Sequence, residues 1–224
     1  MDLFLASNNR HKQKEFSDLF PEHCVIIPAN MGIAFDPDET GTSFAENCLI
    51  KARALFDILA AQNIRAPVLA DDSGLCVDIL GGRPGIRSSR YTGNAESEGA
   101  GYMLSQAEKN RLLVEEVNAA LLPPSLSLKN PRSCRFVCAL VLYAAPDRFF
   151  LAQETMEGEI VKRVDLAHGA GGFGYDPIVR LQEFGKTAAE LLPAEKNAVS
   201  HRGKAARALE KMIIHAELSA KDRE

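Results

Sequence analysis

The segment PVLADDSG, residues 67–74, joins a short apolar run to two adjacent carboxylates. Residues 67–70 predict a brief buried strand, and Asp71 and Asp72 follow it directly. Neighbouring side chains of an extended chain point to opposite faces, so one carboxylate can face a metal ion while the other meets backbone or solvent. Taken alone, the segment is explained equally well by an Asx-turn.

Helices with capping signals are expected before this segment. Residues 3–6 predict another short buried strand, and the polar residues 7–9 lead from it into an amphipathic helix. A stronger helix begins after Ser43, because Ser43 and Glu46 have the spacing of a capping box. Its expected apolar face comprises Phe44, Cys48, Leu49, Ala52, Leu55, Phe56 and Leu59.

Strands and helices continue to alternate in the rest of the chain. Residues 81–93 form a glycine- and proline-rich loop, and residues 106–122 predict a helix that a proline pair stops. Residues 135–145 and 149–156 flank a turn and predict a β-hairpin. The expected apolar face of a last helix comprises Ala205, Leu209, Met212, Ile213 and Ala216. The sequence therefore predicts a single α/β domain over residues 1–224, with a mixed sheet and flanking helices.

The composition is that of an ordinary globular protein, since 46% of the 224 residues are hydrophobic and 25% are charged. No apolar run approaches the roughly 20 residues of a membrane span. The N-terminus turns polar too early for a signal peptide, so we expect a cytoplasmic protein without membrane contact. The net charge of -4 argues against broad binding to nucleic acid, which needs a basic face. Five cysteines without CxxC spacing favour packed, reduced thiols over disulfides or a zinc site.

Polar residues gather in five segments that could carry chemistry. These are SNNRHK (7–12), DETGTSFAENCLIK (38–51), ADDSG (70–74), GGFGYD (171–176) and KNAVSHRG (196–203). In the second segment Asp38 and Glu39 precede a helix, and Mg2+ commonly takes one or two carboxylates while phosphate and water complete its octahedron. On spacing alone, these acids are better explained by the attraction of negative charge to a helix N-terminus.

The segment of residues 7–12 combines small polar side chains with a lysine at a helix N-terminus, where backbone N–H groups favour phosphate. It does not have the Walker A pattern. Capping of the helix by Ser7 or Asn9, with Lys12 merely solvated, explains this loop equally well.

Residues 169–174 fit the GxGxxG pattern of dinucleotide sites. That pattern must open a helix, which Pro177 forbids here, so we exclude a dinucleotide site of this kind. We expect instead a glycine hinge that presents Phe173 and Asp176 to a flat ligand, with burial of Phe173 in the core as the alternative.

The last polar segment contains three hydrogen-bond donors beside a predicted helix start, namely Lys196, His201 and Arg202. Such donors can recognise oxygen acceptors on the edge of a base. Ser200 in the same segment can act simply as a helix cap.

These segments, in this order, resemble the signatures of the inosine triphosphate pyrophosphatase family, also called the Ham1-like family. The resemblance spans nearly the whole chain and is carried by ADDSGLCVDILGGRPGIRSSRY (70–91), GGFGYDPIV (171–179) and KNAVSHRG (196–203). It implies an elongated mixed β-sheet with flanking helices and two lobes around a central cleft, usually in a homodimer. The implied reaction is Mg2+-dependent hydrolysis of non-standard purine nucleoside triphosphates (ITP, dITP, XTP) to the monophosphate and pyrophosphate.

The resemblance also implies a role for each matching residue. Asp72 would be the proton acceptor for the attacking water, Asp72 and Glu39 would serve the magnesium ion, and Lys51 would reach the triphosphate. The residues that would bind substrate are Ser7, Asn8, Asn9, Arg10, His11 and Lys12 at the triphosphate, Ser73 beside them, and Phe173, Gly174, Tyr175, Asp176, Lys196, His201 and Arg202 at the base. Asn8 and His11 stand where the family commonly has glycine, and asparagine tolerates the left-handed backbone region.

The donors among these residues suit a 6-oxo purine, which presents an acceptor where adenine has an amino group, because Arg and Lys side chains only donate. Three other functions fit the sequence less well. A pyrophosphatase of the related Maf type lacks the pair of segments GGFGYD and SHRG. A nucleotide sensor without turnover has no need of Asp72, Glu39 and Lys51 together. An RNA-binding module needs a basic, aromatic sheet face that this acidic chain does not offer.

Overall fold

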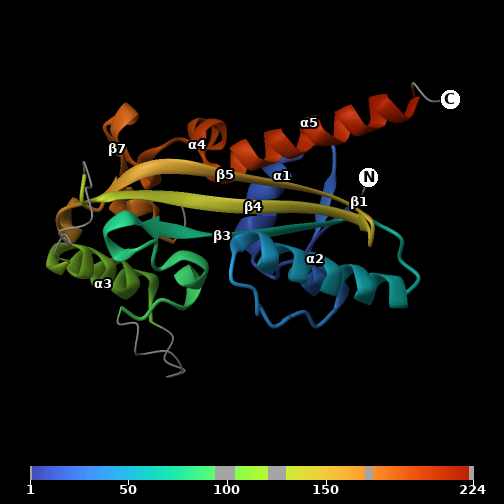
Figure 1. Cartoon of the computed structure of the whole chain (residues 1–224), viewed down its shortest axis with the longest axis horizontal. Helices are drawn as coiled ribbons and strands as arrows, with labels where there is room; N and C mark the ends of the chain where they lie inside the picture. Colours follow the sequence, from blue (N-terminus) through green and yellow to red (C-terminus); the bar gives the residue numbers. More distant parts are fainter. Residues whose placement is uncertain (1, 94–103, 121–129, 170–173, 222–224) are drawn as a thin grey trace. The chain divides into compact units, whose positions relative to one another are not determined.

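The computed structural model describes residues 2–93, 104–120, 130–169 and 174–221, which Figure 1 shows coloured along the chain. Their strands form an open sheet of seven in the order β2-β1-β3-β4-β5-β6-β7. The strands are β1 (Asp2–Leu5), β2 (Cys24–Ile26), β3 (Val68–Val77), β4 (Ser133–Ala145), β5 (Arg148–Ile160), β6 (Val179–Leu181) and β7 (Lys186–Thr187). β1 pairs in parallel with β2 and β3, whereas β6 pairs antiparallel with β5 and β7. The predicted mixed α/β sheet is therefore confirmed.

The chain divides into two compact units. The first comprises Met1–Ser73, Cys138–Glu154 and Asn197–Glu224, and the second comprises Gly74–Val137 and Thr155–Lys196. The unit boundaries fall inside β3, β4 and β5, so each of these strands contributes residues to both units. The single domain and the central cleft stay predictions. Over the described residues, no helix has both the length and the apolar content needed to cross a bilayer.

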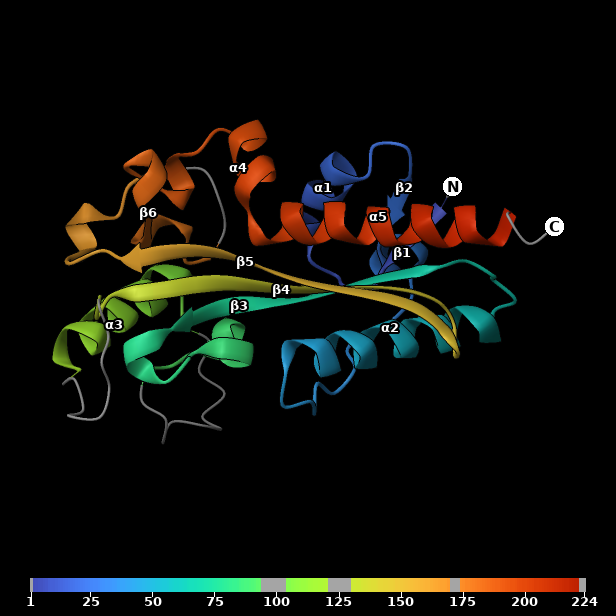
Figure 2. The same cartoon turned by 45° about the horizontal axis from the view of Figure 1, so that its top comes forward.

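In the first unit, helices cover both faces of the sheet (Figure 2). α1 (Arg10–Leu19) and α5 (His201–Lys221) lie on one face, and α2 (Phe44–Ala61) lies on the other. The core beneath α1 and α5 comprises Leu3, Leu5, Phe16, Phe20, Val25, Ile27, Leu69, Cys138, Leu140, Leu142, Ala152, Ala205, Ala206 and Leu209. Because both faces are covered, the central strands are apolar on both sides, which makes them recognisable as short apolar runs in the sequence.

Side-chain caps determine where these helices begin. Asn9 caps α1, since its Oδ1 accepts hydrogen bonds from the backbone N–H groups of His11 and Lys12 at 2.9 and 3.3 Å. The predicted capping box of α2 is confirmed, with Ser43 and Glu46 bonded reciprocally. The side chain of Ser200, which follows α4 (Pro193–Val199), accepts a bond from the Gly203 N–H at 3.0 Å, as its predicted capping role requires.

Some predicted boundaries and faces are wrong. β3 does not end before the carboxylates but continues to Val77, and Leu75 and Val77, beyond the polar residues, are also buried. Leu49 and Phe56, both expected on the apolar face of α2, are only half-buried. Met212 is 41% exposed, and the C-terminal turns of α5 extend past the strands in both views (Figures 1 and 2). The side chain of Ala216 lies outside the described residues.

In the second unit, α3 (Gln106–Ala119) begins at a capping box of Ser105 and Glu108. It ends earlier than predicted, since Ala120 already has an extended backbone. Within the loop of residues 81–93, residues 85–90 form a 3-10 helix, and Arg83 Nη2 in this loop lies 2.6 Å from Glu116 Oε1 of α3.

Candidate active site

Asp71 and Asp72 lie in the middle of β3 and meet different helices of the first unit. Asp71 Oδ2 is 2.6 Å from the Lys12 ammonium of α1, and Asp72 Oδ1 is 2.6 Å from the Lys51 ammonium of α2. Opposite faces were predicted for the two carboxylates, and these different partners agree with that prediction. The expectation that the second carboxylate meets backbone or solvent is wrong, because Asp71 is fully buried and surrounded by side-chain donors.

The partners of Asp71 explain how a buried carboxylate remains charged. Ser73 Oγ and Cys138 Sγ donate hydrogen bonds to it at 3.3 and 3.1 Å, and Arg202 Nε lies 3.5 Å away. Burial alone would raise the pKa of Asp71, but the charges of Lys12 and Arg202 hold this pKa well below its usual range. Asp71 is therefore an anion that pairs with two cations, Lys12 and Arg202, at this face of β3.

Arg202 lies in the same network at the start of α5. Its guanidinium is 2.8 Å from Glu15 Oε2 and donates to Ser73 Oγ at 2.7 Å. Arg202 and Lys12 were expected at the base and the triphosphate respectively, and the structure brings both to Asp71. His201 is buried beside Arg202.

Lys51 joins two carboxylates on the other face. Its ammonium lies 3.2 Å from Glu39 Oε1 in addition to its contact with Asp72, and the lysine is only 7% exposed. Burial lowers the pKa of Lys51, but the two carboxylates more than offset this effect, so the net shift is upward and the ammonium stays charged. The N-terminus of α2 is capped by its own box, so Glu39 has a direct side-chain partner beyond any interaction with the helix dipole.

Asp72 has the properties of a proton acceptor. Burial raises the pKa of its carboxyl group, and the charge of Lys51 offsets that effect only partly. A carboxylate with a raised pKa is a stronger base. Among the described residues, no group donates a hydrogen bond to its second oxygen, Oδ2, which is buried. Such an oxygen has an unused lone pair that suits a metal ion, a water molecule or a substrate proton.

The donor set near Lys51 fits a magnesium ion bound jointly with substrate. Mg2+ usually takes one or two carboxylates and completes its shell with phosphate oxygens and water. Asp72 and Glu39 supply such carboxylates. Within the described part of the chain, no group of three or more His, Cys, Asp or Glu side chains could hold a metal ion by itself.

The loop of residues 7–12 is held by its own side chains. Ser7 Oγ accepts a hydrogen bond from the Asn9 N–H at 3.2 Å. Asn8 Nδ2 donates to the Phe35 carbonyl at 2.9 Å, and Asn8 Oδ1 accepts from the Ala29 N–H at 3.2 Å. Asn8 does not adopt the left-handed backbone region, so the tolerance of asparagine for that region is not used here. Arg10 and His11 are exposed at the start of α1.

The expected base segment belongs to the second unit, where Phe173 lies outside the described residues. Asp176 is 2% exposed and lies 2.7 Å from the Lys196 ammonium. The Tyr175 hydroxyl donates to the Ser88 carbonyl at 2.8 Å. Asn110 Nδ2 of α3 donates to the Gly174 carbonyl at 3.3 Å. The segment Gly174–Asp176 is therefore held by contacts from three other parts of the unit.

Comparison with known proteins decides the family. Residues 3–212 match the model of the Ham1 family. This chain belongs to the Ham1 family. It is 45% identical over 213 residues to the dITP/XTP pyrophosphatase of Treponema denticola, covering 95% of this chain and 98% of the relative. It is 39% identical over 207 residues to the protein of the same name from Geobacillus kaustophilus, covering 91% of this chain and 90% of that relative.

Solved structures agree with this assignment. A HAM1 protein from Coxiella burnetii is 35% identical with a TM-score of 0.75, over 96% of this chain and 99% of that one. The Ham1 protein of Staphylococcus aureus is 31% identical with a TM-score of 0.73, over 97% of this chain and 100% of that one. The signatures that suggested the Ham1 family therefore identified it correctly.

Sequence reasoning missed two residues that hold the expected base segment, Ser88 and Asn110. Both are buried polar residues, 6% and 7% exposed. Asn110 has a sequence signal, since it precedes the buried Leu113, Val114 and Val117 at helical spacing and is the polar member of that face. Ser88 gives no comparable signal, because its contact with Tyr175 uses a backbone carbonyl that every residue has.

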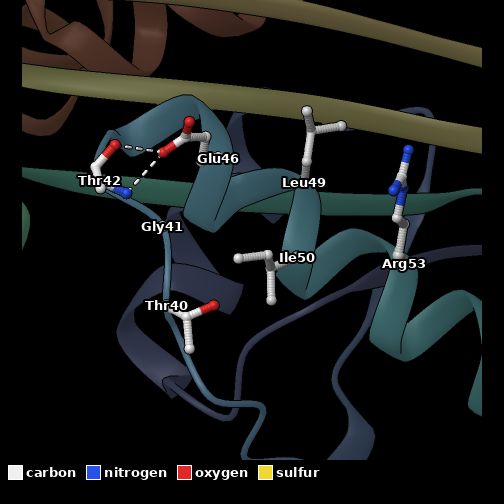
Figure 3. Close-up of a pocket in the computed structure, with 7 residues that line it drawn as sticks. All are labelled: Thr40, Gly41, Thr42, Glu46, Leu49, Ile50 and Arg53. Carbon is white, nitrogen blue, oxygen red and sulfur yellow. Dashed lines mark hydrogen bonds between the residues drawn. The ribbon is translucent and has the colours of Figure 1, made fainter.

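A surface pocket of about 430 Å³ lies along the N-terminal half of α2 in this Ham1 chain (Figure 3). Its lining residues are Thr40, Gly41, Thr42, Glu46, Leu49, Ile50 and Arg53. Glu46 accepts hydrogen bonds from the Thr42 hydroxyl and backbone N–H at 2.8 and 2.6 Å. None of the expected site residues is among those that line this pocket.

Proposed function

We propose that this protein hydrolyses non-standard purine nucleoside triphosphates, namely ITP, dITP and XTP, to the nucleoside monophosphate and pyrophosphate. The relatives named dITP/XTP pyrophosphatase, which align over nearly the whole chain, support this substrate class. The observation that carries the chemistry is the buried Asp72 carboxylate, which has Lys51 on one oxygen and no hydrogen-bond donor from the described residues on the other.

In the proposed reaction, Asp72 removes a proton from water as the water oxygen attacks phosphorus. A new P–O bond forms, the P–O bond that links the α- and β-phosphates breaks, and pyrophosphate leaves with the electron pair. Lys51 carries positive charge beside Asp72 and would stabilise negative charge on the phosphates in the transition state. The raised pKa of Asp72 allows it to accept the proton near neutral pH more readily than an ordinary aspartate.

Mg2+ dependence is part of this proposal. Asp72 and Glu39 would hold the ion, which when bound would neutralise phosphate charge and orient the attacking water. The Asp72 oxygen without a hydrogen-bond donor and the proximity of both carboxylates to one ammonium support this assignment. Ser7, Asn9 and Lys12 at the start of α1 would contact the phosphates, because the dipole of a helix start and the charge of the Lys12 ammonium attract anions.

Recognition of the base is assigned to Gly174, Tyr175 and Asp176 together with Lys196, His201 and Arg202. Lysine and arginine only donate, which favours the 6-oxo group of hypoxanthine or xanthine over the amino group of adenine. A site that reads such a group can reject the wrong base by about 10⁴-fold, since buried donors would otherwise be unpaired.

We also infer that the protein is a cytoplasmic homodimer. The resemblance to the family supports the homodimer, and the alignment with relatives named dITP/XTP pyrophosphatase, whose substrates are free nucleotides, supports the location. Light scattering of the purified chain at several concentrations tests the first inference: a mass of one chain at all concentrations contradicts it.

The decisive experiment measures the products. The protein is incubated with Mg2+ and ITP, XTP, GTP or ATP separately, and nucleotides, pyrophosphate and orthophosphate are quantified. Monophosphate and pyrophosphate from ITP or XTP are expected, with ATP and GTP nearly untouched. Asp72→Asn should be inactive, whereas Asp57→Asn, the same change at an exposed position of α2, should be fully active.

Other outcomes of that assay would reject the proposal. Diphosphate with orthophosphate contradicts cleavage between the α- and β-phosphates. Equal turnover of all four nucleotides contradicts base recognition. Tight ITP binding without turnover favours a nucleotide sensor over an enzyme.

A further inference from the structure

Asn110 is a buried amide on a helix face that is otherwise apolar. It is 7% exposed, and Leu113, Val114 and Val117 on the same helix α3 are also buried. Its Nδ2 donates to the Gly174 carbonyl at 3.3 Å, and its Oδ1 accepts from Gln106 Nε2 at 2.9 Å. A leucine would satisfy the packing of this face without the desolvation cost of an amide, so the hydrogen bond to Gly174 is the distinctive contribution of asparagine here.

Gly174 needs an external contact because its own backbone is unusual. Its φ is +68°, in the left-handed region, and a Cβ at this position would meet nothing within 4 Å. Glycine is therefore required here for backbone conformation rather than for space. A glycine has many alternative conformations, and a bond to its carbonyl restricts that freedom.

The next two residues are held from other directions. Tyr175 is 5% exposed, burial raises the pKa of its hydroxyl, and this neutral hydroxyl donates to the Ser88 carbonyl at 2.8 Å. Ser88 is itself fixed, since its Oγ accepts from the Leu75 N–H at 2.8 Å and donates to the Gly85 carbonyl at 2.6 Å. Asp176 is held by Lys196.

We propose that Asn110 is a positioning residue for base recognition, which acts by orienting the Gly174 carbonyl and thereby the segment Gly174–Asp176. This inference rests on the proposed function, in which that segment contacts the purine. Lys196 is assigned to the base, whereas Asn110 acts through the backbone of Gly174. Loss of the Asn110 amide donor therefore weakens recognition of the nucleoside part of the substrate and leaves binding of the phosphates intact.

The test compares Asn110→Asp with Asn118→Asp. The first change keeps the shape and the acceptor for Gln106 but places a carboxylate oxygen against the Gly174 carbonyl. The second is the same change on the same helix, at a side chain that donates to the Lys162 carbonyl at 3.1 Å and is not part of the base segment. The KM and kcat for ITP and the dissociation constants of inosine monophosphate and inorganic tripolyphosphate are measured for both variants and for the unmodified protein.

For Asn110→Asp, the KM for ITP and the dissociation constant of inosine monophosphate should rise about tenfold, the order expected for a lost buried hydrogen bond. Its tripolyphosphate affinity and kcat should stay within about twofold of the unmodified protein. Asn118→Asp should leave all four quantities unchanged. A general structural effect would instead weaken both ligands together.

If a thermal melt shows that Asn110→Asp is not folded, the same quantities are measured for Asn110→Leu, whose side chain is apolar like those of its neighbours on α3. Unchanged binding of inosine monophosphate in a folded Asn110 variant overturns the inference, and so does equal weakening of both ligands. Failure of the unmodified protein to cleave ITP or XTP rejects the proposed function and this inference with it. If the unmodified protein cleaves them but a folded Asn110 variant binds inosine monophosphate unchanged, only this inference is rejected.

Discussion

The Lys51 ammonium lies 2.6 Å from one oxygen of Asp72, while no described residue donates a hydrogen bond to the other oxygen of that buried carboxylate. The pair therefore has a neutralised side and an open side. Asp71, the preceding residue, differs because both of its oxygens have side-chain partners. This asymmetry supports the proposal that Asp72, rather than Asp71, acts on a ligand.

Lys51→Gln should lower kcat for ITP by about 10²-fold or more, because a positive charge placed at the reacting phosphates is lost. Steady-state kinetics at saturating substrate measure this effect. Arg53→Gln, the same kind of change two residues further along α2 at an exposed position, is the control and should be active. Similar losses in both variants would contradict a specific role for Lys51.

Asp71→Asn should destabilise the protein by about 3 kcal/mol without removing any group assigned to the reaction. The reason is that Lys12 and Arg202 would lose the buried anion that compensates their charges, and breaking one side of a buried ion pair typically costs about 3–5 kcal/mol. Urea unfolding gives the free energy of unfolding. Asp18→Asn, at an exposed position of α1, should change it by less than about 0.5 kcal/mol. An unchanged free energy for Asp71→Asn would show that the network around Asp71 contributes no net stability.

Gly203→Ala should be strongly destabilising. A Cβ at this position would lie 1.9 Å from the Asn197 carbonyl oxygen, so the backbone joining α4 to α5 would have to move. Overpacking of this kind costs about 1–3 kcal/mol or more. Thermal unfolding measures it, with Lys211→Ala on the exposed side of α5 as the control. Equal melting temperatures of the two variants would mean that the backbone between α4 and α5 can move at no measurable cost in stability.

Removal of divalent metal by a chelator should abolish pyrophosphate release, and added Mg2+ should restore it. Glu39→Gln should raise the Mg2+ concentration needed for half-maximal activity by at least about tenfold, because it loses one of two proposed carboxylate ligands. Asp38→Asn changes the adjacent exposed acid and should behave like the unmodified protein. Full activity in the chelator would reject the metal site.

The sequence by itself determined the local elements and the family. Apolar runs identify strands that are buried on both faces, as with residues 3–6, and the serine and glutamate three residues apart identify the start of α2. These signals are local, because they depend on neighbours along the chain. The signatures of residues 70–91 and 196–203 identified the Ham1 family for the same reason, since they can be compared position by position.

Only the tertiary structure decided which partner each functional group has. Adjacent aspartates look alike in sequence, but alternation along β3 directs Asp71 to Lys12 and Asp72 to Lys51, from helices 59 and 21 residues away in the chain. The contact of Asn110 with Gly174 spans 64 residues and uses a backbone carbonyl, which leaves no trace in residue type. Burial and charge at such long-range contacts set the pKa of each carboxylate, and these contacts form only when the chain packs into its tertiary structure.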